Sequence, residues 1–134
     1  MSIFKHIVLL FLLLLAPSIV GQEVLVASIS EYNITIKNAK PGSVIVLKNG
    51  VWNDFKMNAF GDGEKGNPII VKAETPGKVL ITGNSTLNIS GNYVIVSGLW
   101  FKDGNSSYKS VVQFRNDAKA YANNCRFTNS TISY

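Results

Sequence analysis

The chain has 134 residues, with 13 Lys and Arg against 8 Asp and Glu, and it is 46% hydrophobic and 16% charged. This composition is too apolar for a disordered chain and fits one domain or a piece of one. The single cysteine, Cys125, excludes a disulfide framework, and the single histidine, His6, lies in a segment that we expect to be removed. A mature chain without His cannot build a Ser-His-Asp centre or a His-ligated zinc site, so most common hydrolase chemistries are excluded.

Residues 1–21 have the layout of a secretory signal peptide. Lys5 and His6 precede the apolar run 7–16, and small residues follow it as far as Gly21. The run is shorter than the roughly 20 residues needed to span a bilayer. We therefore expect no stable membrane anchor and an exported protein, periplasmic or secreted.

Residues 28–39 predict one amphipathic helix. Ser28 and Glu31 have the spacing of a capping box, in which each side chain accepts from a backbone N–H at the start of the helix. Apolar residues then recur at steps of three, four and three, and Pro41-Gly42 ends the pattern. These apolar residues are Ile29, Tyr32, Ile36 and Ala39.

Short β-branched runs alternate with turns rich in Gly, Asn, Ser and Pro after the helix. The runs that begin at Val44, Ile69 and Val94 are spaced 25 residues apart, a period that indicates a solenoid. Secondary runs lie between them, with Trp52 and Trp100 in comparable places. A fourth, looser turn is expected over 121–134. Stacked rungs of this kind predict an all-β fold, a right-handed parallel β-helix capped by the N-terminal helix.

The alternative architecture is a doubly wound α/β sheet, which needs a helix between successive parallel strands. Residues 58–68 argue against it, because they contain three Gly and one Pro and have no helical period. We therefore expect residues 22–134 to form the cap and first coils of a β-helix domain. Because 131–134 is an apparent strand run without a capping element, we expect this sequence to be the N-terminal portion of a longer protein.

Several segments together resemble the start of polysaccharide lyase family six, which contains alginate lyases and chondroitinase B. They cover nearly the whole mature chain in the family's order, and the resemblance implies a right-handed parallel β-helix with a helical N-terminal cap. The segments are Lys-Pro-Gly at 40–42, Val-Leu-Lys-Asn-Gly-Val-Trp at 46–52, Gly-Asn-Pro-Ile-Ile-Val-Lys-Ala-Glu-Thr-Pro-Gly-Lys-Val at 66–79, Ser-Gly-Leu-Trp-Phe-Lys-Asp-Gly at 97–104 and Asn-Asn-Cys-Arg-Phe-Thr-Asn at 123–129.

The resemblance implies cleavage of a uronate polysaccharide by β-elimination, in which a base removes the proton at C5 and the 4-O-linked sugar leaves. In the family, Ca²⁺ held by Asn and Glu oxygens neutralises the substrate carboxylate, a Lys is the base and an Arg stands near the leaving oxygen. None of these positions can be carried onto this sequence. We expect the catalytic residues beyond residue 134, calcium in the full-length family member, and no metal bound by this chain.

Three basic residues late in the chain, Arg115, Lys119 and Arg126, are the candidates for binding an acidic polysaccharide. The alternative interpretation, which we favour, is ordinary solvated charge on turns and outward strand positions. The net charge of +5 agrees with an acidic partner but does not select one. Export argues against nucleic acid.

Acidic and aromatic residues suggest two further sites. Asp54, Asp62 and Glu64 invite a calcium interpretation, but their spacing fails the EF-hand pattern, so polar turns are favoured. A sugar-stacking platform is the alternative to packing within or between coils for four aromatic residues, and packing is favoured. They are Trp52, Tyr93, Trp100 and Phe101.

The leading hypothesis is an exported alginate lyase, represented here by its cap and first coils. The segments 72–78 and 49–52 look closer to alginate lyases than to chondroitinase B. The alternatives are a chondroitinase B-type dermatan sulfate lyase and a non-catalytic β-helical module that binds carbohydrate or serves as a surface protein. We expect the chain alone to lack the active site and lyase activity.

Overall fold

The computed structural model describes residues 23–104, 110–117 and 119–133; the predicted signal peptide lies outside them. These residues form one helix and fourteen short strands. In chain order the elements are β1 (Glu23–Val26), α2 (Ile29–Lys37), β2 (Val44–Leu47), β3 (Gly50–Asn53), β4 (Lys56–Ala59), β5 (Ile69–Ala73), β6 (Val79–Gly83), β7 (Thr86–Ile89), β8 (Gly91–Asn92), β9 (Val94–Ser97), β10 (Leu99–Gly104), β11 (Val112–Gln113), β12 (Ala122–Asn123), β13 (Arg126–Thr128) and β14 (Thr131–Ser133).

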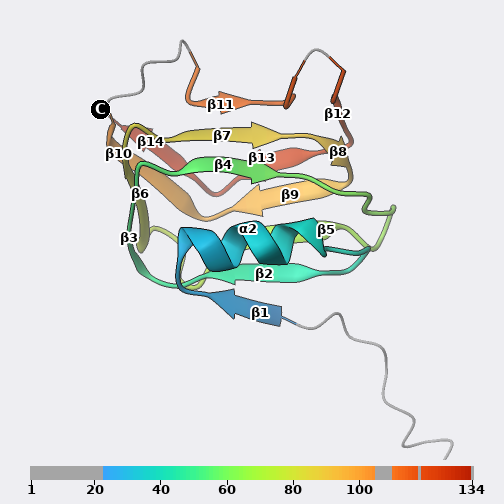
Figure 1. Ribbon diagram of the computed structural model, residues 1–134, viewed down its shortest axis with the longest axis horizontal. Coiled ribbons are helices and arrows are strands. Elements are labelled where there is room, and N and C mark those ends of the chain that lie inside the picture. The colour runs from blue at the N-terminus through green and yellow to red at the C-terminus, as the bar shows by residue number, and fades with distance from the viewer. Residues whose placement is uncertain (1–22, 105–109, 118, 134) are drawn as a thin grey trace, which may run out of the picture.

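The strands stack into four parallel ladders, with β1 and β11 towards opposite ends of the stack (Figure 1). Sheet A has the order β1-β2-β5-β9-β13, sheet B β3-β6-β10-β14, sheet C β4-β7-β11 and sheet D β8-β12. Each coil passes from sheet A to sheet B to sheet C and then returns to sheet A one rung further along. The predicted fold, a right-handed parallel β-helix with an N-terminal helix, is confirmed.

The 25-residue spacing seen in the sequence is the spacing of sheet A. Val44 in β2 pairs with Ile70 in β5, which pairs with Ile95 in β9. The next pair, Ile95 with Arg126 in β13, spans a longer coil. The additional residues fall between β10 and β12, so a longer connection leaves the ladder of sheet A intact.

Helix α2 begins as the capping pattern predicts. The Ser28 hydroxyl accepts from the backbone N–H of Glu31 at 3.1 Å. The Glu31 carboxylate reaches back to the N–H of Ala27 at 2.7 Å, one residue earlier than in a standard capping box. Tyr32 and Ile36 are buried, and α2 contacts β1 and β2. The apolar face of the helix therefore covers the first coil, as expected of a cap.

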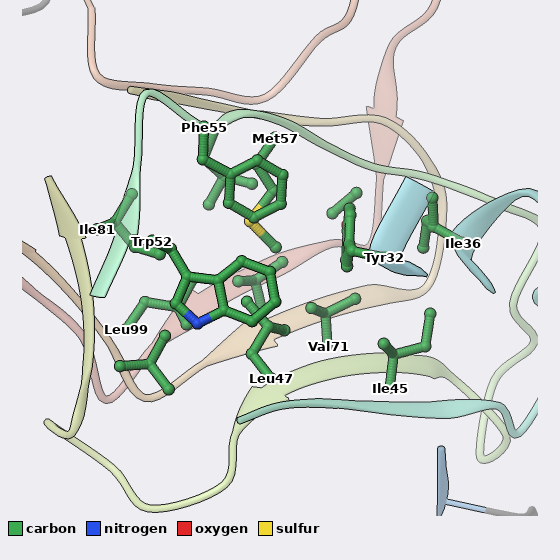
Figure 2. Packing of buried hydrophobic residues seen from close by; sticks show 14 of the residues in the cluster. Tyr32, Ile36, Ile45, Leu47, Trp52, Phe55, Met57, Val71, Ile81 and Leu99 are labelled. Carbon is green, nitrogen blue, oxygen red and sulfur yellow. The ribbon is translucent and has the colours of Figure 1, made fainter. Parts of the chain in front are cut away.

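The core is a column of side chains that point into the coil from all sides (Figure 2). The Phe55 ring meets Tyr32 edge-on at 5.2 Å and stacks on Trp52 at 5.5 Å between ring centroids. Met57 and Leu47 complete the contact beneath these rings. The cap helix and the first complete coil thus share one hydrophobic core, which stabilises both through the apolar area they bury.

The two tryptophans are not in equivalent places, and the sequence interpretation was wrong on this point. Trp52 pairs with Ile81, and Ile81 pairs with Phe101, so Trp52 shares an inward row with Phe101. Trp100 is one residue out of that row and points outward. A shift of one residue in a strand moves a side chain to the opposite face. Trp100 donates its indole N–H to the Ser133 hydroxyl at 2.8 Å, so it packs between neighbouring coils on the outside.

The helices give no sign of a membrane span: within residues 23–104, 110–117 and 119–133, none is long and apolar enough to cross a bilayer.

Candidate functional site

The outer face of sheet C carries a regular array of polar side chains. In β4 and β7, Met57 and Leu87 are fully buried and paired with each other, so their neighbours in each strand point the other way. Outward Lys56 stands beside Thr86 of the next coil, and Asn58 stands beside Asn88. The ladder continues into β11, where Gln113 pairs with Asn88. Sheet C therefore presents a column of three amides along the axis of the coil.

These side chains line an open groove of about 310 Å³. Its lining consists of one cationic side chain, one hydroxyl and four amides, without a carboxylate. The residues are Lys56, Asn58, Thr86, Asn88, Gln113 and Asn116. We call this surface the sheet C groove. Neutral amides and a cation suit a ligand with many hydroxyls and negative charge.

The groove is held by hydrogen bonds between coils. The Asn88 side-chain amide donates to the Asn58 side-chain oxygen at 3.3 Å, which links successive rungs. The backbone carbonyl of Asn58 accepts from the buried Tyr32 hydroxyl at 2.8 Å. The Lys56 ammonium donates to the side-chain oxygen of Asn84, between β6 and β7. Because a neighbouring residue orients each of these side chains, the groove is shaped before any ligand arrives.

Two of the three basic candidates, Arg115 and Lys119, lie in the connection between β11 and β12. The Asp117 carboxylate accepts from the backbone N–H groups of Lys119 and Ala120 at 2.6 and 2.9 Å. These bonds, with a smaller contribution from the Arg115 charge, hold the pKa of Asp117 below its usual value. Arg115 donates to the Asp117 carbonyl, and its guanidinium lies 5.5 Å from the centroid of the Tyr121 ring. The turn accounts for the position of Arg115.

The third candidate, Arg126, lies on a different ladder. It begins β13 of sheet A and lines a second groove of about 460 Å³ together with Glu64, Tyr93 and Cys125. This groove contains both an acidic and a basic side chain, so it does not favour a polyanion as the sheet C groove does. Cys125 is partly exposed, with its thiol 3.5 Å from the Gly91 carbonyl. The structure therefore divides the predicted basic cluster between two parts of the coil.

The acidic residues considered for calcium make hydrogen bonds in turns. Asp54, at φ 52°, accepts from the backbone N–H of Asn84 at 2.8 Å. Asp62 accepts from the Asn92 side chain at 2.6 Å, and Glu64 forms a local backbone bridge with Asn67. Within the part of the chain that the structure describes, no group of three or more His, Cys, Asp or Glu side chains is placed to hold a metal ion. These residues do not fit a calcium centre.

Sequence reasoning missed the sheet C groove. The available signal was the alternation Lys56-x-Asn58, repeated as Thr86-x-Asn88 at a distance of 30 residues. The strand repeat searched for was 25 residues, which holds on sheet A but not on sheet C. Coils with connections of different lengths have different periods on different faces.

Parallel ladders closed by a cap helix, with a polar groove along one ladder, define a parallel β-helix protein. The family model described as chondroitinase B matches residues 26–134. The chain belongs to this family, and the resemblance to polysaccharide lyase family six is confirmed. A search of curated protein sequences finds no match.

Solved structures of family six lyases match the fold. The PL6 family alginate lyase AlyGC is 40% identical with a TM-score of 0.81, over 83% of this chain and 15% of its own. The polysaccharide lyase Pedsa3628 from Pseudopedobacter saltans is 34% identical with a TM-score of 0.72, over 81% of this chain and 24% of its own. A mannuronic acid specific family 6 lyase from human gut microbiota is 30% identical with a TM-score of 0.73, over 82% and 26%. The chain thus spans about a quarter or less of the length of these relatives.

Proposed function

We propose that this chain is the N-terminal part of an exported polysaccharide lyase that cleaves alginate by β-elimination. The observation that carries the proposal is the 40% identity to the alginate lyase AlyGC over 83% of the chain. The relative described as mannuronic acid specific supports the same polymer class. The predicted signal peptide at residues 1–21 supports export.

The chemistry sets what a complete site must provide. The proton at C5 of a uronate lies next to a carboxylate, so the anion formed on its removal carries adjacent negative charges. Catalysis needs a base at C5, a proton donor at the leaving oxygen, and positive charge or hydrogen-bond donors at the carboxylate. The described residues supply donors in the sheet C groove. They include no His and no carboxylate in that groove to act as a base.

We therefore place the base and the proton donor outside residues 23–133. The family resemblance also implies Ca²⁺, for which this chain offers no fitting cluster. On this proposal any calcium requirement belongs to other coils of the complete protein. The chain's own share of the work is to cap the β-helix and to extend its binding surface.

The test uses the full-length product of the gene. It is incubated separately with poly-mannuronate, poly-guluronate and dermatan sulfate, with and without chelator, and the absorbance of the unsaturated product is followed. We expect cleavage of an alginate polymer that chelator abolishes. Chelator-resistant cleavage would overturn the calcium requirement, and failure to cleave either alginate polymer would overturn the proposed substrate.

The second candidate is a dermatan sulfate lyase, favoured by the description of the matching family model as chondroitinase B. The dermatan sulfate reaction decides between the two. Residues 22–134, expressed alone, should release no unsaturated product. Turnover by this fragment would show that the catalytic residues have been misplaced. Binding by the full-length protein without cleavage would instead support a non-catalytic carbohydrate-binding module.

A further inference from the structure

The sheet C groove has a geometry that neither the family assignment nor the sequence candidates explain. Its amides repeat once per coil, at Asn58, Asn88 and Gln113, in direct register. Neighbouring parallel strands lie about 4.8 Å apart. This spacing is close to the length of one pyranose unit in an extended polysaccharide. A sugar chain laid along the coil axis would therefore meet one amide at each unit.

The charge of the groove selects among such chains. Lys56 is the only charged residue among the six that line it. Its ammonium has three donors, of which the bond to Asn84 uses one. A carboxylate on the ligand would gain a charge-assisted hydrogen bond there without repulsion from an acidic wall. An uncharged sugar would gain nothing from this lysine.

The amides are suited to ring hydroxyls. Each amide carries an acceptor oxygen and a two-proton donor, so it can accept from one hydroxyl and donate to its neighbour. The Asn88 amide uses one proton on Asn58, which fixes the orientation of both side chains. Fixing them beforehand lowers the entropy cost of binding. A purely structural amide ladder would need neither the open groove nor the cation at its end.

We propose that the sheet C groove is a binding subsite for a uronate polysaccharide, lying along the coil axis with a carboxylate on Lys56 and hydroxyls on Asn58, Asn88 and Gln113. This rests on the proposed function and deepens it by assigning binding residues in this chain. The subsite grips the polymer through one charged contact and several neutral ones. It therefore contributes to binding of the polymer rather than to the bond-breaking step.

The experiment uses two substitutions in the full-length protein. K56E reverses the one charge in the groove, and Q113E places a carboxylate in the amide column with little change in shape. The matched control is K78E, because Lys78 is exposed in the turn between β5 and β6 and does not line the groove. Each variant is measured by affinity electrophoresis in gels containing alginate, by steady-state cleavage, and by thermal unfolding.

We expect K56E and Q113E to weaken binding and raise KM about fivefold, with kcat and the unfolding midpoint unchanged, and the K56E effect to shrink at high salt. K78E should match the wild type. Normal cleavage with an unchanged KM in both variants would overturn the subsite and leave the lyase proposal standing. Binding that both substitutions weaken, in a protein that cleaves nothing, would support the subsite and overturn the lyase proposal. A wild-type protein that binds no uronate polymer would overturn the subsite.

Discussion

The hydroxyl of Tyr32 in α2 donates a hydrogen bond of 2.8 Å to the backbone carbonyl of Asn58 in β4. β4 is the edge strand of sheet C on the N-terminal side, so this carbonyl has no strand beside it. An unpaired edge is costly when buried and prone to aggregation when open. Tyr32 thus lets a helix take the place of the missing strand. The same residue, Asn58, turns its side chain into the sheet C groove.

Replacing Tyr32 with Phe should therefore lower the free energy of unfolding by about 1–2 kcal/mol, because the ring still packs while the Asn58 carbonyl loses its donor. Burial raises the pKa of Tyr32 above its usual value, so the hydroxyl stays protonated and remains a donor through the neutral and mildly basic range. Urea unfolding measures the change. The control is Tyr121→Phe, since Tyr121 is 60% exposed. Equal stability of the Tyr32 and Tyr121 variants would contradict this role.

The fold could be predicted from the sequence because its signals are local. Ser28 and Glu31 mark the start of the helix through contacts within one turn. The runs at Val44 and Ile69 keep a constant period because sheet A turns have similar lengths. The sheet C groove could not be predicted in this way, because Lys56 and Thr86 become neighbours only through the register of two coils. That register depends on turn lengths that no single segment reveals.

The inward and outward tryptophans predict very different costs of truncation. Trp52 is 5% exposed and stacks on Phe55, so Trp52→Ala should destabilise the protein by about 3–5 kcal/mol. Trp100 lies on the outer face, where its losses are one hydrogen bond to Ser133 and a cation–π contact with Lys102 at 5.1 Å. Trp100→Ala should cost about 1–2 kcal/mol. Similar costs in urea unfolding would place both residues in one row and refute the register.

The turn that holds Arg115 should depend on the charge of Asp117. Because the folded-state pKa of Asp117 is lowered, its contribution to the turn is present above the unfolded-state pKa of about 3.9 and is lost as the pH falls through the folded value. The amide signals of Lys119 and Ala120, followed by NMR, should titrate with a midpoint below about 3.9. Asp117→Asn should abolish this titration. A midpoint above that value would mean that the carboxylate does not make these two bonds.

The stacking of coils can be tested at glycine. Gly91 begins β8 at φ +90°, and a Cβ there would overlap the backbone carbonyl of Gly61 in the coil below. Gly77 has a similar φ of +79°, but a Cβ there would meet nothing within 4 Å. Both Ala variants carry the strain of a positive φ, about 1–2 kcal/mol, and only Gly91→Ala also forces two coils apart. We expect Gly91→Ala to cost about 1–3 kcal/mol more than Gly77→Ala in urea unfolding. Equal costs would show that the coils approach less closely at this corner than the structure has them.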